Sequence, residues 1–202
     1  MLGALLGPTR AAAVDLDDDV AIPLPEERPA LLAGTFEVGT LSTLSPGSFC
    51  PGAGACVLGG GVALGASVGR RWASGLGVAL GYDLWLLDSG GVYEVLVVQS
   101  VSAAVRYVAL PRVRVHPFVE GRVGALALGG SFRVGALGAS MEPRLGLEFE
   151  LTERIAVSGA LGVRWMVATP FTTPNDGVLR GGSGPPGVSL AVSLGLVVLQ
   201  AS

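Results

Sequence analysis

Hydrophobic and polar residues alternate with a period of two along most of this chain. In residues 143–151 the odd positions are Pro143, Leu145, Leu147, Phe149 and Leu151, and the even positions are Arg144, Gly146, Glu148 and Glu150. A period of two places the two sets on opposite faces of a β-strand. The segment therefore predicts a strand with one apolar face and one face that carries charges of both signs.

Eight segments show this alternation, and most of them have ten residues or more. They span residues 32–41, 61–71, 76–87, 93–108, 115–126, 141–151, 155–167 and 188–199. Strands in soluble proteins average about 5–6 residues, whereas a tilted strand that crosses a membrane needs about 9–11. The pattern predicts an all-β protein, an eight-stranded antiparallel up-and-down transmembrane β-barrel.

The connections between these segments fall into two groups. Short connections follow the second, fourth and sixth segments, at residues 72–75, 109–114 and 152–154. Mostly longer ones follow the first, third, fifth and seventh segments, at residues 42–60, 88–92, 127–140 and 168–187. Short turns at one rim and long loops at the other are typical of bacterial outer-membrane barrels. We expect both chain ends to lie at the rim with the short turns.

Composition also favours a membrane barrel. Half of the 202 residues are hydrophobic and only 14% are charged, against about 25% in ordinary soluble domains. No stretch of about 20 apolar residues, the length a membrane-spanning helix needs, is present. A closed barrel is then the remaining way to cross a membrane, because every backbone polar group must be paired inside lipid. The net charge of −3 and the lack of a basic stripe exclude a nucleic-acid partner.

The make-up of the two faces indicates which one is inside. The polar face consists mostly of Gly, Ala and Ser, which suits the crowded interior of an eight-stranded barrel. The apolar face would then contact lipid. The alternative is a soluble, lipocalin-like barrel that binds a ligand, in which the two faces are reversed.

A lipid-facing barrel would place a nearly balanced set of ions in its lumen. The acids are Glu37, Asp83, Glu120, Glu148 and Glu150, and the bases are Arg106, Arg122, Arg144 and Arg164. Buried charges need partners, and arginine can bind a carboxylate with two parallel hydrogen bonds. We expect a lumen that ion pairs close. The alternative is that several of these residues lie unpaired at the wet rims.

The strand pattern resembles that of small eight-stranded outer-membrane β-barrel proteins of Gram-negative bacteria, of the OmpA and OmpX kind. Residues 143–166 (PRLGLEFELTERIAVSGALGVRWM) look like a typical hairpin of that class, and the resemblance covers about residues 31–202. It implies a location in the bacterial outer membrane, contact with outer-membrane lipid, and surface or periplasmic protein partners. A monomer without cofactor or metal is expected.

The remaining segments suggest how the chain is processed. Residues 1–13 are expected to be a truncated signal peptide, because a short apolar stretch precedes three alanines. The acidic, proline-containing residues 14–30 are expected to form a flexible lead-in, and residues 31–202 the barrel. Cys50 and Cys56, six positions apart, are expected to form a disulfide in an oxidising compartment. Two free thiols are the alternative.

The sequence offers little evidence of catalysis. His116 is the only histidine, and it is expected to be a polar residue of the turn rim. Glu148 and Glu150 share a face, as two glycosidase carboxylates might, but a ladder of ion pairs in the lumen gives the same spacing. We therefore expect a structural or surface-interaction protein and no enzyme. A narrow-lumen transporter of small or apolar solutes and a lipid-modifying enzyme are the alternatives.

Overall fold

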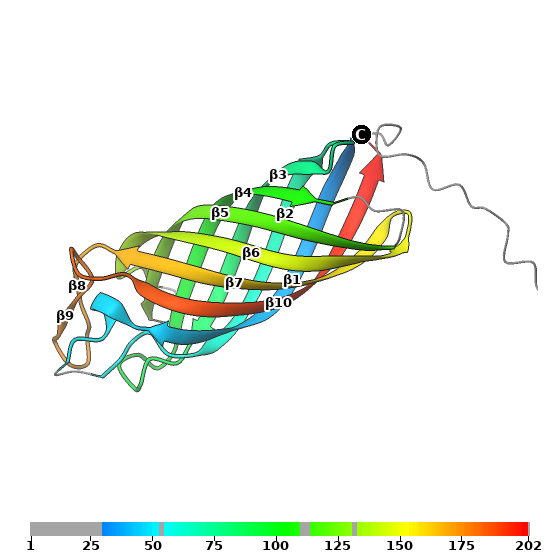
Figure 1. Cartoon of the computed structure of the whole chain (residues 1–202). Coiled ribbons are helices and arrows are strands. Elements are labelled where there is room, and N and C mark those ends of the chain that lie inside the picture. Colours follow the sequence, from blue (N-terminus) through cyan, green and yellow to red (C-terminus); the bar gives the residue numbers. More distant parts are fainter. Residues whose placement is uncertain (1–29, 53–54, 110–113, 131–132, 202) are drawn as a thin grey trace, which may run out of the picture.

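The computed structural model describes residues 30–52, 55–109, 114–130 and 133–201. It is a closed barrel of eight antiparallel strands, with a small two-stranded hairpin outside it (Figure 1). The fold class that the alternation predicts is therefore confirmed. The expected signal peptide and nearly all of the expected lead-in lie outside the described residues.

All eight barrel strands are long. They are β1 (Leu31–Ser45), β2 (Gly61–Arg71), β3 (Leu76–Leu87), β4 (Leu96–Val108), β5 (Val115–Gly130), β6 (Ala136–Thr152), β7 (Ile155–Ala168) and β10 (Gly187–Ala201). The connection from β7 to β10 contains the two-residue strands β8 (Phe171–Thr172) and β9 (Leu179–Arg180). A short 3₁₀ turn, η2 (Gly47–Phe49), follows β1.

Strand β1 closes the barrel by pairing with both β2 and β10. Leu31 lies opposite Arg71 in one ladder and opposite Ala201 in the other. The remaining strands pair with their neighbours in sequence, so the barrel has no free edge. Closure matters in lipid, where an unpaired backbone group costs several kcal/mol.

The two ends of the barrel differ in their connections. One end, called the turn-side rim here, has the three short turns and the ends of β1 and β10, and the other, the loop-side rim, has η2 and the β8–β9 hairpin (Figure 1). The turn between β2 and β3 depends on Gly75, whose φ of 84° is costly for other residues. Gly75 donates a hydrogen bond from its N–H to the carbonyl of Trp72 at 2.9 Å, which tightens the turn.

The strands match the expected segments best at the turn-side rim. The predicted bounds of β2 and β3 are those observed. The prediction of a long loop at residues 127–140 is wrong, because β5 continues to Gly130 and β6 begins at Ala136. Both extensions are paired with a neighbouring strand: Gly130 lies opposite Leu96 of β4, and Ala136 lies opposite Leu128 of β5.

Exposure alternates along the strands as the sequence predicts. The outward residues Phe36, Leu80, Val101, Leu145 and Leu194, each on a different strand, are between 62% and 65% exposed. Val97 is an exception: its position in the alternation places it outside, but it is only 2% exposed. Soluble proteins rarely expose so large a continuous apolar surface, so the outer wall is suited to lipid.

Within the described residues, the structure contains no helix long and apolar enough to span a membrane.

Candidate functional site: a charged barrel lumen

The lumen contains five arginines and five carboxylates that form one network. Every barrel strand except β10 contributes at least one of these charged side chains. The arginines are Arg71, Arg106, Arg122, Arg144 and Arg164, and the carboxylates are Glu37, Asp83, Glu120, Glu142 and Glu148. Equal numbers of opposite charges leave the network close to neutral, which lowers the cost of burying it.

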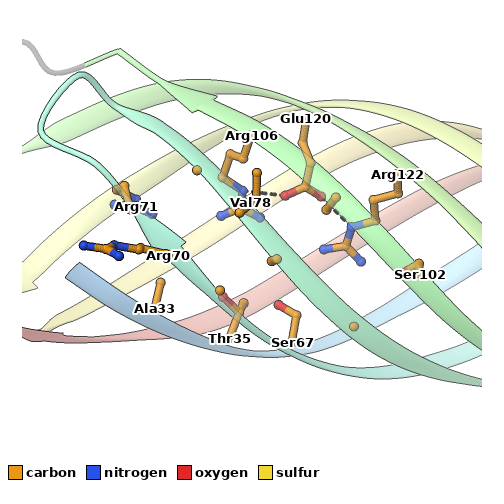
Figure 2. A pocket seen from close by; sticks show the side chains of 15 residues that line it. Ala33, Thr35, Ser67, Arg70, Arg71, Val78, Ser102, Arg106, Glu120 and Arg122 are labelled. Atoms are coloured by element: carbon orange, nitrogen blue, oxygen red, sulfur yellow. Dashed lines mark hydrogen bonds and ion pairs between the residues drawn. The ribbon is translucent and has the colours of Figure 1, made fainter. Parts of the chain in front are cut away.

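At the centre of the network, three arginines surround two glutamates. Arg106 and Arg122 each donate from Nε to a different oxygen of Glu120, both at 2.5 Å. Arg144 donates from Nη1 to both oxygens of Glu37 at 3.0 and 3.2 Å and to Glu120 at 3.1 Å. These five residues are called the central ion cluster below. They come from β1, β4, β5 and β6, so the cluster ties opposite walls of the barrel together (Figure 2 shows Arg106, Glu120 and Arg122).

Towards the loop side, the network ends at a tryptophan. Arg164 donates from Nε to Glu142 at 2.5 Å, and its Nη2 lies 3.9 Å from Asp83. The guanidinium of Arg164 also stacks on the Trp85 ring, 3.8 Å from the ring centroid. A cation over a desolvated tryptophan ring is favourable, so Trp85 joins the charged lumen to the apolar region above it.

Towards the turn side, Glu148 is fully buried and takes two parallel hydrogen bonds from Arg71. The two N–O distances are 2.7 and 2.8 Å. Arg106 lies 3.6 Å from the same carboxylate and stacks on Phe118 at 4.2 Å. The Arg71–Glu148 pair thus closes the charged network near the turn-side rim.

Small residues make room for these side chains. A Cβ at Gly162 would lie 2.7 Å from Oε1 of Glu142 and 2.8 Å from Cγ of Arg144. Both approaches are closer than real Cβ contacts allow. Gly162 therefore gives the neighbouring strand the space in which its two charged side chains lie.

The structure brings together eight of the nine lumen residues that the alternation singles out. Glu150 is the exception, because it lies outside this network and contacts His116: the distance from Nε2 to Oε1 is 2.9 Å. His116 was expected to be a polar residue of the turn rim. It is the second residue of β5, at that end of the barrel, but it is only 1% exposed. It is buried because it shares the inward parity of Glu120 and lies opposite Glu148 of β6.

Two members of the network were not predicted from the sequence. Arg71 is the last residue of β2, and Glu142 precedes Pro143 in β6. The signal was available, since both residues have the inward parity of their strands. Arg71 was not predicted because it lies at the end of its strand, and Glu142 was not predicted because it precedes a proline.

Above the charged network, an apolar cluster fills the loop-side end of the barrel. We call it the apolar cap. Its loop members are Phe49, Val57, Leu58, Val92 and Phe171, and they pack on barrel residues that include Leu41, Trp85, Leu126, Leu128 and Met166. Phe49 and Phe171 are in ring contact with centroids 6.4 Å apart. The loops therefore fold into the mouth of the barrel.

A disulfide and a buried arginine hold the cap loops in place. The predicted disulfide is present between Cys50 and Cys56, beside the cap residues Phe49 and Val57. Arg180, which is 1% exposed, donates to both oxygens of Asp176 and to the carbonyl of Ala55 at 2.8 Å. The hydrogen bonds from Arg180 and Thr173 hold the pKa of the Asp176 carboxylate well below its ordinary value.

Little empty space remains in the lumen. A cavity of about 40 Å³ lies between the central ion cluster and the turn-side rim, where Thr35, Ser67 and Ser102 line it (Figure 2). A second cavity of about 30 Å³ lies beside Glu37, Asp83 and Trp85, and one of about 10 Å³ lies within the cap. A water molecule needs at least about 10–15 Å³ of such space, so these cavities suit a few waters.

The described residues contain no cluster of His, Cys, Asp and Glu that could hold a metal ion. The ionic side chains of the lumen are turned towards one another, so their charges are neutralised by ion pairs.

Comparison with known proteins supports the fold. The structure is similar to Neisserial surface protein A, with a TM-score of 0.59 and 14% identity over 85% of this chain and 99% of that one. It is also similar to the outer membrane protein OprG from Pseudomonas aeruginosa, with a TM-score of 0.58 and 11% identity over 89% and 100% of the two chains. No protein-family model and no curated protein sequence matches the chain. The chain therefore has the fold of the small outer-membrane barrels, as the sequence predicts.

Proposed function

We propose that this chain is an integral protein of a bacterial outer membrane, a monomeric barrel with a sealed lumen that supports the membrane and presents its loops at the cell surface. The observation that carries the proposal is the filled lumen: beside the ion network and within the apolar cap, the described residues enclose cavities of only about 40, 30 and 10 Å³. Such a barrel separates two compartments without joining them.

The membrane location is supported by the outer wall and by the similar structures. Leucine, valine and phenylalanine side chains stand exposed on neighbouring strands all around the barrel. In water they would favour aggregation; in lipid they are in their preferred solvent. A monomer is supported because the closed sheet leaves no edge for pairing with another chain.

A non-enzymatic role is supported by how the polar groups are used. The one histidine is buried against Glu150, and Glu148 is held by two hydrogen bonds from Arg71. The Glu148 carboxylate is fully buried, so it is not presented to a substrate. The ion network serves to fill the barrel and fix its shape.

Solute uptake tests the sealed lumen against the transporter alternative. The full chain, folded into liposomes, should admit amino acids, sugars and short fatty acids no faster than empty liposomes do. A porin of known permeability serves as the positive control. Uptake of any of these solutes above the empty-liposome rate would replace the structural role with a transport role.

Epitope insertion tests the orientation. An epitope placed after Asn175, an exposed loop-side residue, should bind antibody on intact cells of a Gram-negative host. The matched insertion after Glu153, in the exposed turn between β6 and β7, should bind only after the outer membrane is opened. The reverse result would mean that the loops face the periplasm.

A further inference from the structure

Exposed charges are distributed unequally between the two rims. Among the described residues, the turn-side rim exposes Arg70, Arg114 and Arg154, with Glu153 as its one fully exposed acid. Each of the three short turns thus has one exposed arginine within it or beside it. The loop-side rim exposes the acids Asp88, Glu94 and Asp176 and a single arginine, Arg133.

These arginines are not part of the lumen network. Arg70 is the residue before Arg71, and the alternation of β2 turns it outward, whereas Arg71 is buried against Glu148. Figure 2 shows the two side chains next to each other at this end of the barrel. Trp72 and Tyr107, both exposed, lie at the same rim, and such aromatic residues prefer the level of lipid headgroups.

An apolar groove of about 710 Å³ runs along the outer wall above two of the arginines. Its walls include Tyr107, Val119, Pro143, Leu145 and Leu161. At Gly121, on its floor, a Cβ would have no atom within 4 Å, so the space there is open. The β6–β7 ladder pairs Met141 with Trp165 and resumes only at Arg144 and Gly162, since Pro143 has no N–H to donate.

The groove lies at a depth that a lipid chain from the same leaflet reaches. Val119 is four residues from the start of β5, about 13 Å along the strand, and one leaflet contributes about half of the 30 Å hydrocarbon core. Arg114 precedes β5, and Arg154 lies in the turn between β6 and β7. One lipid molecule is therefore long enough to place its headgroup at these arginines and an acyl chain in the groove.

We propose that the turn-side rim binds anionic phospholipid of the inner leaflet: Arg70, Arg114 and Arg154 take the phosphate of phosphatidylglycerol-type headgroups, and the groove beside Gly121 takes an acyl chain. The proposal rests on the membrane location proposed above. A basic residue near an anionic membrane surface contributes attraction that corresponds to about fivefold in binding.

Spin-labelled lipids measure the preference directly. The folded full chain in phosphatidylcholine vesicles should immobilise spin-labelled phosphatidylglycerol several-fold more strongly than spin-labelled phosphatidylcholine. The ratio of phosphatidylglycerol to phosphatidylcholine immobilisation should fall towards one at 1 M salt, where charges are screened within about 3 Å. Arg114→Gln should lower it by a few-fold. The matched control Arg133→Gln, which removes the same charge at the other rim, should leave it unchanged.

Two further variants test the contribution of the headgroup site and that of the acyl-chain groove separately. Arg70→Gln/Arg114→Gln/Arg154→Gln should abolish the preference for phosphatidylglycerol. Gly121→Phe, which fills the groove, should weaken immobilisation of both lipids, whereas Gly159→Phe, on the outer wall beyond the groove, should not.

Equal immobilisation of the two lipids by the parent chain would overturn the proposal, as would a preference that survives the triple substitution. Circular dichroism of each sample identifies variants that fail to fold, and the single variants then decide the outcome. Failure of the parent to insert into neutral vesicles would contradict the membrane location instead.

Discussion

The two halves of the lumen are filled by opposite chemistry. Near the turn side, ions such as Glu120 and Arg144 fill it and apolar side chains cover the outside. Near the loop side, Phe49, Trp85 and Leu126 fill it. The filling of the lumen thus changes from ionic to apolar along the barrel axis, and the apolar cap resembles the core of a soluble protein.

The comparison shows that one strand can contribute side chains to both halves of the lumen. β1 places Glu37 in the central ion cluster and, four residues later, Leu41 in the apolar cap. The alternation decides which side chains point inward, and the position along the barrel axis decides whether those side chains are ionic or apolar. Each half fills the lumen with a different kind of side chain, so each should fail in a different way.

The largest effect is expected in the ionic half. Glu148→Ala leaves Arg71 buried without its partner, and breaking a buried pair costs about 3–5 kcal/mol. Arg71→Met/Glu148→Ala, which removes both charges, should regain most of that loss. Urea unfolding in lipid vesicles measures both variants. If Glu148→Ala costs no more than the double variant, the pair does not stabilise the fold.

The outer wall of the same half should be nearly as sensitive. Leu147→Arg puts a charge on the lipid side of β6, and near the middle of the bilayer such a change costs about 2–4 kcal/mol. Val134→Arg, at an exposed loop-side position, is the matched control and should insert normally. Vesicle flotation measures insertion. Equal insertion of Leu147→Arg and the parent would mean that inside and outside have been assigned wrongly.

In the cap, a smaller and local effect is expected. Cys50→Ser/Cys56→Ser removes the disulfide that closes a loop with a sequence separation of 6, which costs about 2 kcal/mol. Because the cap packs on a barrel that is complete without it, hydrogen exchange should accelerate in residues 46–60 and stay slow in β2 and β6. Faster exchange throughout the barrel would show that the two halves unfold together.

The smallest effect is expected when the pH is lowered, which weakens one ion pair of the cap. The pKa of Asp176 is lowered in the folded cap, so its ion pair with Arg180 stabilises the cap above the ordinary value of 3.8 and is lost as pH falls through the lower folded value. Hydrogen exchange at residues 169–186 should therefore accelerate on acidification below about pH 4. Asp176→Asn should exchange faster at neutral pH and lack this acid response. An unchanged acid response in that variant would assign the effect to another group.

The sequence predicted the charged half better than the apolar half. Inward residues such as Glu120 and Arg122 are two positions apart on one strand, so alternation identifies them locally. The cap forms from residues far apart in sequence, such as Phe49 and Phe171. A contact between two loops leaves no periodic pattern in the sequence, so it could not be predicted in this way.

The other differences have related causes. His116 was expected to be a polar rim residue because it lies near a turn, but its burial depends on β6, which lies beside it only in the closed barrel. Arg71 and Glu142 have inward parity, but they lie at a strand end and beside a proline, and their partners, Glu148 and Arg164, lie on other strands. Parity indicates that a side chain points inward, whereas pairing depends on the register between strands.

Ion current across a planar bilayer tests the sealed lumen most directly. The folded full chain, inserted as single molecules, should give no steady current above that of the bare bilayer at neutral pH, with the disulfide intact. The ion network and the cap together account for that seal. A steady, large conductance from the parent chain would contradict it.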